Sequence, residues 1–171
     1  MVAPTSENSP HRTTRHNRSA SQVENKIPIS PAWTPPSPQN PEVLPAEIIQ
    51  WLDQNACATL ATVEPDGRPQ LSIVWAHHED NRILIATVAG RRKHKNLLRN
   101  PQATVLVAHP ESQDHYVEVR GRAEIIEAGG RELIDFLHEK HRGTRPYPWD
   151  APGEKRVIVS IVPERILVFH G

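Results

Sequence analysis

The sequence predicts an α+β barrel of six or seven short, mainly antiparallel strands with two or three inserted helices, spanning residues 43–171. Two patterns support this fold class. Short apolar runs alternate with a period of two and are separated by turn residues. Other segments repeat apolar residues at helical spacing. The chain length of 171 residues is that of one domain.

Residues 1–42 differ in composition from this domain. They hold many of the 17 prolines, mixed with Ser, Thr, Asn and Arg and few large apolar residues. Such a segment buries too little surface to offset its ordering entropy, so we expect a disordered or polyproline-like tail. Two other interpretations stay open. The tail is a docking arm for a partner, or it is a start-site artefact, because a valine codon at Val43 could serve as a start.

The first half of the domain is expected to contain a helix followed by a three-stranded meander. Leu44, Ile48 and Leu52 repeat at four-residue spacing, which is typical of an amphipathic helix. The next segments alternate or are rich in β-formers, and polar turns separate them. Antiparallel strands are therefore predicted at residues 57–63, 70–77 and 82–88.

The second half is expected to add two helices and the remaining strands. Gly90 precedes a helix over residues 91–99, which Asn100-Pro101 ends. From Val117 to Ile125, small or apolar residues alternate with charged ones, as in a half-buried strand. The other predicted elements are strands at 103–109, 156–162 and 166–169, a helix that opens at Gly129-Gly130, and a loop over 142–152.

Composition excludes several function classes. The formal net charge is zero and no apolar run approaches the length of a membrane span, so we expect no nucleic-acid or membrane partner and a cytoplasmic location. Cys57 is the only cysteine, which excludes an intrachain disulfide and a cysteine-based zinc site. The ten histidines lack partners at ligand spacing, so no metal site is predicted.

The segment from Ala86 to Leu97 carries the main functional signal. A strand ends, Gly90 permits a tight turn, and the next helix begins with Arg91, Arg92 and Lys93. Cations at a helix N-terminus oppose the macrodipole, so a compensating anion is expected there. Free backbone N–H groups with Arg and Lys form a phosphate seat. On pattern alone, a solvent-exposed basic helix face is the open alternative.

Together with this segment, three further runs resemble the pyridoxamine 5'-phosphate oxidase-like family (PPOX class). They are Ala58-Thr-Leu-Ala-Thr-Val63 with Pro65-Asp-Gly-Arg-Pro-Gln-Leu-Ser72, then Val117-Glu-Val-Arg-Gly-Arg-Ala123, and Val162-Pro-Glu-Arg-Ile166, which resembles the family's last hairpin. The runs keep the family's order and spacing, and the resemblance as a whole covers essentially all of residues 44–171. Within the family, the likeness is to the branch that uses the deazaflavin coenzyme F-420.

The resemblance implies an FMN-binding split barrel that forms a homodimer, with a flavin-type cofactor held between the two chains. By matched position, it implies cofactor contacts from Ser72 and Val74 along the isoalloxazine ring and from Ala86 and Thr87 on the next strand. Arg92 and Lys93 match the pair that binds the phosphate, with Lys95 and Asn96 one turn further along the helix. Tyr116 is implied to complete the partner's site. The strand from Gln70 to Ala76 lacks the cations of the true oxidases, so oxidation of vitamin B6 is not implied.

The charge of the helix over residues 91–99 favours coenzyme F-420, which carries a phosphodiester and an acidic glutamyl tail. We interpret the chain as an F-420-dependent oxidoreductase that transfers a hydride between the reduced coenzyme and a small electrophilic substrate. An FMN-binding reductase or oxidase and a non-catalytic F-420-binding or storage protein are the alternatives. No nucleophile–base pair is visible, so no catalytic side chain is predicted. Trp149 either lines a substrate mouth or anchors a loop.

Overall fold

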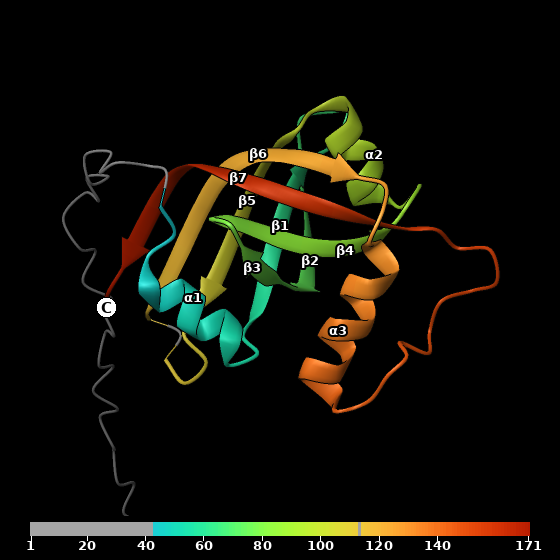
Figure 1. The fold of residues 1–171 in the computed structure, drawn as a ribbon. Coiled ribbons are helices and arrows are strands. Elements are labelled where there is room, and N and C mark those ends of the chain that lie inside the picture. The colour runs from blue at the N-terminus through green and yellow to red at the C-terminus, as the bar shows by residue number, and fades with distance from the viewer. Residues whose placement is uncertain (1–42, 113) are drawn as a thin grey trace, which may run out of the picture. The chain divides into compact units, whose positions relative to one another are not determined.

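The computed structural model describes residues 43–112 and 114–171, so the predicted tail at residues 1–42 lies outside the described part. Figure 1 shows the elements of this part. In chain order they are α1 (Ala46–Asp53), β1 (Cys57–Val63), β2 (Pro69–Trp75), β3 (His77–Glu79), β4 (Arg82–Val88), α2 (Arg92–Arg99), β5 (Gln102–Ala108), β6 (Tyr116–Ile126), α3 (Gly130–Arg142) and β7 (Arg156–Phe169). None of the helices described here is long and apolar enough to cross a membrane.

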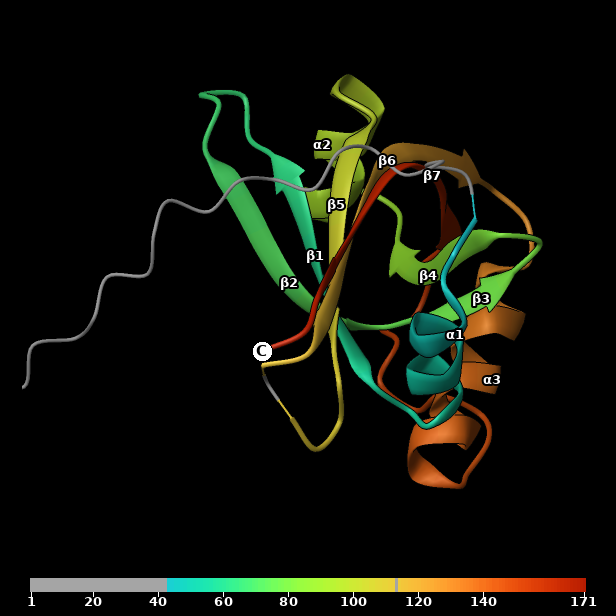
Figure 2. The same ribbon diagram turned by 90° about the vertical axis from the view of Figure 1, so that its left-hand side faces the viewer.

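The strands form one antiparallel sheet in the order β2-β1-β5-β6-β7-β4-β3. Its two edge strands, β2 and β3, follow each other in the chain with only Ala76 between them. The sheet therefore has to curl until its edges approach, and β2 also contacts β4. Figures 1 and 2 show this curvature, with α2 near the top of the barrel and α1 near its bottom. The predicted α+β split barrel is confirmed.

The core fills the inside of the curled sheet. Alternate residues of β1, β5 and β6 point inward, as their period-two sequences require, and the predicted alternation of β6 is confirmed. Ile48 and Leu52 of α1 are fully buried against this core. On the other side, Leu133 and Leu137 of α3 pack with Leu84 of β4 in a separate cluster. The three predicted helices are all present.

The predicted meander is wrong. β2 ends at Trp75 and pairs with β1, whereas β3 pairs with β4, so the predicted strand at 70–77 is split between the two ends of the sheet. Ala76 at the break is fully buried. Sequence alternation shows which face of the sheet a residue takes but not which strand lies beside it. The passage of the chain from edge strand β2 to edge strand β3 therefore could not be predicted from the sequence.

The predicted final hairpin is also wrong, because β7 continues without a turn from Arg156 to Phe169. Pro163 lies opposite Gly121, where the register of the β6–β7 pair shifts. A bulge tolerates a proline, which has no N–H to donate to the ladder. A Cβ on Gly121 would lie 2.1 Å from the carbonyl oxygen of Val162, so this position requires glycine.

Candidate functional site

A cavity of about 250 Å³ lies where β2, β4, the start of α2, α3 and the loop before β7 meet. Three cations line one part of it: Arg91, Lys93 and Arg156. Aromatic rings line another part and form its aromatic wall: Trp75, Tyr147 and Trp149. The cavity thus offers positive charge for an anion and flat apolar surfaces for a planar group.

The turn between β4 and α2 brings the first cations to the cavity. Gly90 has φ of 84°, a left-handed conformation that suits glycine and lets the helix begin directly after the strand. The backbone N–H of Gly90 donates to Nδ1 of His94 at 3.1 Å. The side chain of the N-cap residue, Arg91, makes no capping hydrogen bond. The first turn can therefore offer backbone N–H groups as well as side-chain cations to an anion.

Lys93 is the half-buried cation of this cavity. Burial lowers the pKa of its ammonium group, and the neighbouring Arg91 and Arg156 guanidiniums lower it further. No carboxylate within residues 43–112 and 114–171 forms an ion pair with Lys93. A bound anion would relieve this crowding of positive charge. The residues present therefore fit the phosphate of a flavin-type cofactor.

Arg156 begins β7 and has a side chain only 4% exposed. Its Nε donates to the two carboxylate oxygens of Asp150 at 3.0 and 3.1 Å. Its guanidinium lies 4.7 Å from the centroid of the Tyr147 ring. The hydrogen bond from Arg156 holds the pKa of the Asp150 carboxyl below its usual value, so the pair is charged at neutral pH.

The loop between α3 and β7 is tied to α3 by Arg131. Arg131 donates to Asp150 at 3.1 Å and to the carbonyl oxygen of Tyr147 at 3.0 Å. Asp135, one turn along the helix, accepts the backbone N–H of Tyr147 at 2.8 Å. These bonds hold both the aromatic wall and the partner of Arg156 in place.

The aromatic wall extends behind the cavity. Trp75 stacks on His141 with ring centroids 4.8 Å apart and an interplanar angle of 10°. Tyr147 and Trp149 meet edge to face at 5.2 Å, and both contact His138. Trp149 lines the cavity, is 61% exposed, and its ring contacts hold it against the loop and α3. That it lines a substrate mouth stays a prediction.

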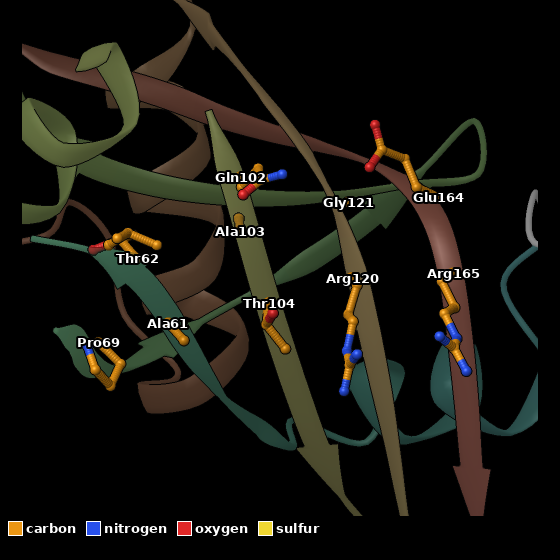
Figure 3. Close-up of a pocket in the computed structure, with 11 residues that line it drawn as sticks. Ala61, Thr62, Pro69, Gln102, Ala103, Thr104, Arg120, Gly121, Glu164 and Arg165 are labelled. Carbon is orange, nitrogen blue, oxygen red and sulfur yellow. The ribbon is translucent and has the colours of Figure 1, made fainter. Parts of the chain in front are cut away.

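A larger hollow of about 480 Å³ lies elsewhere, on the outer face of the sheet. Figure 3 shows Thr104, Arg120 and Arg165 on three neighbouring strands of this face. Arg120 is already paired with Glu118 on its own strand. None of the predicted cofactor contacts lines this hollow. The smaller cavity, where cations and aromatic rings converge, is the candidate site.

Comparison with known proteins determines the family. The family model described as pyridoxamine 5'-phosphate oxidase matches residues 44–168. The chain belongs to this family. The predicted resemblance is thereby confirmed, and the family is one of oxidoreductases with flavin or deazaflavin cofactors.

The individual relatives share about a third or less of their aligned residues with this chain. A pyridoxine/pyridoxamine 5'-phosphate oxidase from Bordetella petrii is 33% identical, over 58% of this chain and 50% of the relative. The chain spans about half the length of the curated relatives it matches. A solved F-420 reductase is 28% identical with a TM-score of 0.61, covering 68% of this chain and 93% of the other. A conserved hypothetical protein from Mycobacterium tuberculosis is 30% identical with a TM-score of 0.60, covering 78% and 89%.

The family member described here brings part of the predicted contact set together. Val74, Ala86, Thr87 and Lys93 all line the candidate cavity. Thr87 is buried at the end of β4, and Val74 lies on β2, across the cavity. The structure therefore brings these four predicted contacts together, and their binding of a cofactor stays a prediction.

The other predicted contacts lie outside this cavity. Arg92 is directed toward Glu64, 3.6 Å away, and Lys95 is exposed. Asn96 is buried and donates to Thr62 at 3.0 Å. The remaining two also have partners within the chain: Ser72 bonds Gln70 at 2.8 Å, and the ring of Tyr116 stacks on Phe169 at 4.9 Å. Whether Tyr116 reaches a partner's cofactor stays a prediction.

Sequence reasoning missed Arg156 and Tyr147. Arg156 stands at the start of an apolar strand, where a cation is usually solvent-exposed, so its pattern carries no functional signal. Only the pairing of β7 with β4, which sets Arg156 opposite Val88, brings it beside the helix with the other cations. Tyr147 lies in a proline-rich loop without periodicity, and the bonds from α3 determine its position.

Proposed function

We propose that this chain is an F-420-dependent oxidoreductase that passes a hydride from the reduced coenzyme to a small electrophilic substrate. The observation that supports this most is the convergence of Arg91, Lys93 and Arg156 on one cavity with an aromatic wall. FMN carries one phosphate, whereas F-420 carries a phosphodiester and an acidic tail. We propose that Arg92 and Lys95, on the same helix but outside the cavity, bind that tail.

The cofactor, when bound, supplies the redox chemistry, and the protein supplies binding and orientation. Lys93 and the first-turn N–H groups of α2 would hold its phosphate, with Thr87 as a neighbouring polar contact. Val74 and Ala86 would contact its ring system. Trp75 and Trp149 would shield the ring from water and offer a flat surface to the substrate. We assign no catalytic acid or base.

We further propose that the functional unit is a homodimer with the cofactor between the chains. Leu71 and Ile73 on the edge strand β2 are 63% and 79% exposed. Large apolar side chains on a sheet edge are a feature that association covers. Ile73 also lines the candidate cavity, so a second copy on this edge would close the site.

FMN is the alternative cofactor, and one finding favours it. The curated relatives are named pyridoxine/pyridoxamine 5'-phosphate oxidases, although they match only part of this chain. Under this alternative the chain is an FMN-binding reductase or oxidase of the same fold.

Parallel titration of the purified protein with coenzyme F-420 and FMN tests the proposal. Trp75 and Trp149 line the cavity, so tryptophan fluorescence reports binding at this site. We expect the tighter binding for F-420, followed by oxidation of the reduced coenzyme when an enone or quinone is added. Preference for FMN would move the chain to the flavin branch. Tight F-420 binding without oxidation by any acceptor would indicate a binding or storage protein.

A further inference from the structure

The loop between α3 and β7 contributes carboxylates to two of the three cations at the candidate site. Asp150 binds Arg156, and Glu154 pairs with Arg91 at 3.4 Å. Both acids lie within five residues of chain that α3 holds through Arg131. The loop thus supplies a carboxylate partner to both guanidiniums.

Arg156 is the more constrained of the two. Asp150 binds one edge of its guanidinium, and the Tyr147 ring covers a face. The remaining surface lines the cavity next to Lys93, which is close enough for the two charges to interact. A buried ion pair of this kind has little net charge, so its contribution to a ligand lies in directed N–H donors.

We propose that Arg156 is a third cation of the phosphate seat and that Asp150 is the positioning residue that holds it there. This inference rests on the proposed function, because it takes the cofactor's phosphate as the anion. It adds to the seat a strand residue from the far end of the domain. It also makes the α3–β7 loop a determinant of cofactor affinity, through Asp150, rather than a surface connection.

Paired ligands with and without phosphate test this assignment. The probes are FMN with riboflavin, and coenzyme F-420 with its deazaflavin core lacking the phosphodiester side chain. For Arg156→Gln we expect affinity for the phosphorylated ligand to fall by about tenfold or more, the equivalent of one charged hydrogen bond. Affinity for the phosphate-free ligand should stay within about twofold, since the ring contacts are unchanged.

Asp150→Asn separates positioning from charge. Removing a carboxylate makes the cavity more positive, so an effect of charge alone would tighten phosphate binding. If Asp150 positions Arg156, the same variant weakens binding of the phosphorylated ligand and spares the phosphate-free one. The matched control is Lys155→Gln. Lys155 precedes Arg156 in the chain, but its ammonium group donates to Glu127 and does not line the cavity. This control should keep wild-type affinity for both ligands.

A folding defect is distinguished by the double variant Asp150→Asn with Arg156→Gln. Removing both partners leaves no buried unpaired charge, so we expect a thermal midpoint near the wild type and the same loss of phosphate-dependent affinity. Equal losses for both ligands of a pair, or tighter binding by Asp150→Asn, would overturn the inference.

Inorganic pyrophosphate keeps this test independent of the cofactor. If wild-type protein binds neither F-420 nor FMN, the proposed function fails. The seat is then probed by the rise in thermal midpoint that pyrophosphate causes. A rise in the wild type that Arg156→Gln abolishes would support the anion seat. No rise, or an equal rise in both proteins, would overturn it.

Discussion

At the scale of single residues, Lys93 is a cation in an unfavourable environment. It is half-buried, it faces two guanidiniums, and the described part of the chain offers it no carboxylate. Arg92, its neighbour in sequence, is exposed and directed toward Glu64 instead. Two adjacent cations of one motif thus have different surroundings, and only Lys93 has the burial that makes an anion bind strongly.

We expect Lys93→Ala to weaken cofactor binding by about 1.5–3 kcal/mol, the range for a hydrogen bond to a charged group. Fluorescence titration with FMN measures it. Lys95→Ala is the matched control, because Lys95 is exposed outside the cavity and FMN lacks the acidic tail. Unchanged affinity in Lys93→Ala would mean that the phosphate lies elsewhere. An equal loss in Lys95→Ala would return Lys95 to the phosphate seat.

At the scale of elements, the contact between α3 and β7 determines where Arg156 stands. Gly130 at the start of α3 lies against the backbone of β7, and a Cβ there would be 2.4 Å from the carbonyl carbon of Arg156. The same helix carries Arg131 and Asp135, which hold the loop. A close backbone approach therefore couples the packing of α3 to the geometry of the site.

Gly130→Ala should lower the free energy of unfolding by about 1–3 kcal/mol through overpacking, although alanine favours helices. Urea denaturation measures this change. Glu132→Ala, an exposed position in the same turn, is the control, with an expected change within about 0.5 kcal/mol. Equal stability of Gly130→Ala and the wild type would show that α3 can move away from β7 at little cost.

The pH dependence of stability also belongs to this scale. Burial lowers the pKa of His141 on α3, and the charges of Lys140 and Arg142 lower it further. Burial also lowers the pKa of His77 on β3, and His78 and Lys140 add to this effect. Between the folded pKa and the usual 6.5, the unfolded chain binds more protons. The free energy of unfolding should therefore fall as the pH drops through 6.5.

Denaturant titrations at a series of pH values from 8 to 5.5 measure this fall. Below the unfolded pKa, the free energy of unfolding should change with pH at a roughly constant slope. His141→Gln should show a shallower fall than the wild type, because it removes one of the two groups. An identical pH profile in the variant would exclude His141 as a contributor.

At the scale of the whole molecule, the curled sheet leaves β2 as an exposed edge beside the candidate cavity. Leu71 and Ile73 alternate with half-buried neighbours there, so their exposure follows from the strand's own pleat. Ile73 also lines the cavity. In the proposed dimer a second copy would cover this edge, which would couple dimerisation to cofactor binding.

We expect the wild type to be a dimer and Leu71→Asp a monomer in sedimentation or light scattering, because the variant would bury a charge in the proposed interface. Leu98→Asp is the control, since Leu98 is also 63% exposed but lies on α2 and not on the edge strand. A wild-type monomer, or an unaffected dimer in Leu71→Asp, would contradict an interface on this edge.

The sequence by itself determined the features whose physical causes are local. The three helices, the turn at Gly90 and the alternation of β6 follow from periodicity, turn residues and side-chain type over short windows. Thr87 and Lys93, which the family motif singles out, both line the cavity because strand, turn and helix are contiguous in the chain there.

Only the tertiary structure decided the break at Ala76, the unbroken β7 and the meeting of Arg156 with Lys93. Each depends on which strands become neighbours when the sheet curls, and strand pairing joins residues far apart in the chain. Local patterns assign a residue to a face, but hydrogen-bonded neighbours and ion pairs are set by the closure of the whole sheet. The local motif therefore brings Thr87 and Lys93 to the candidate site, and the pairing of distant strands adds Arg156.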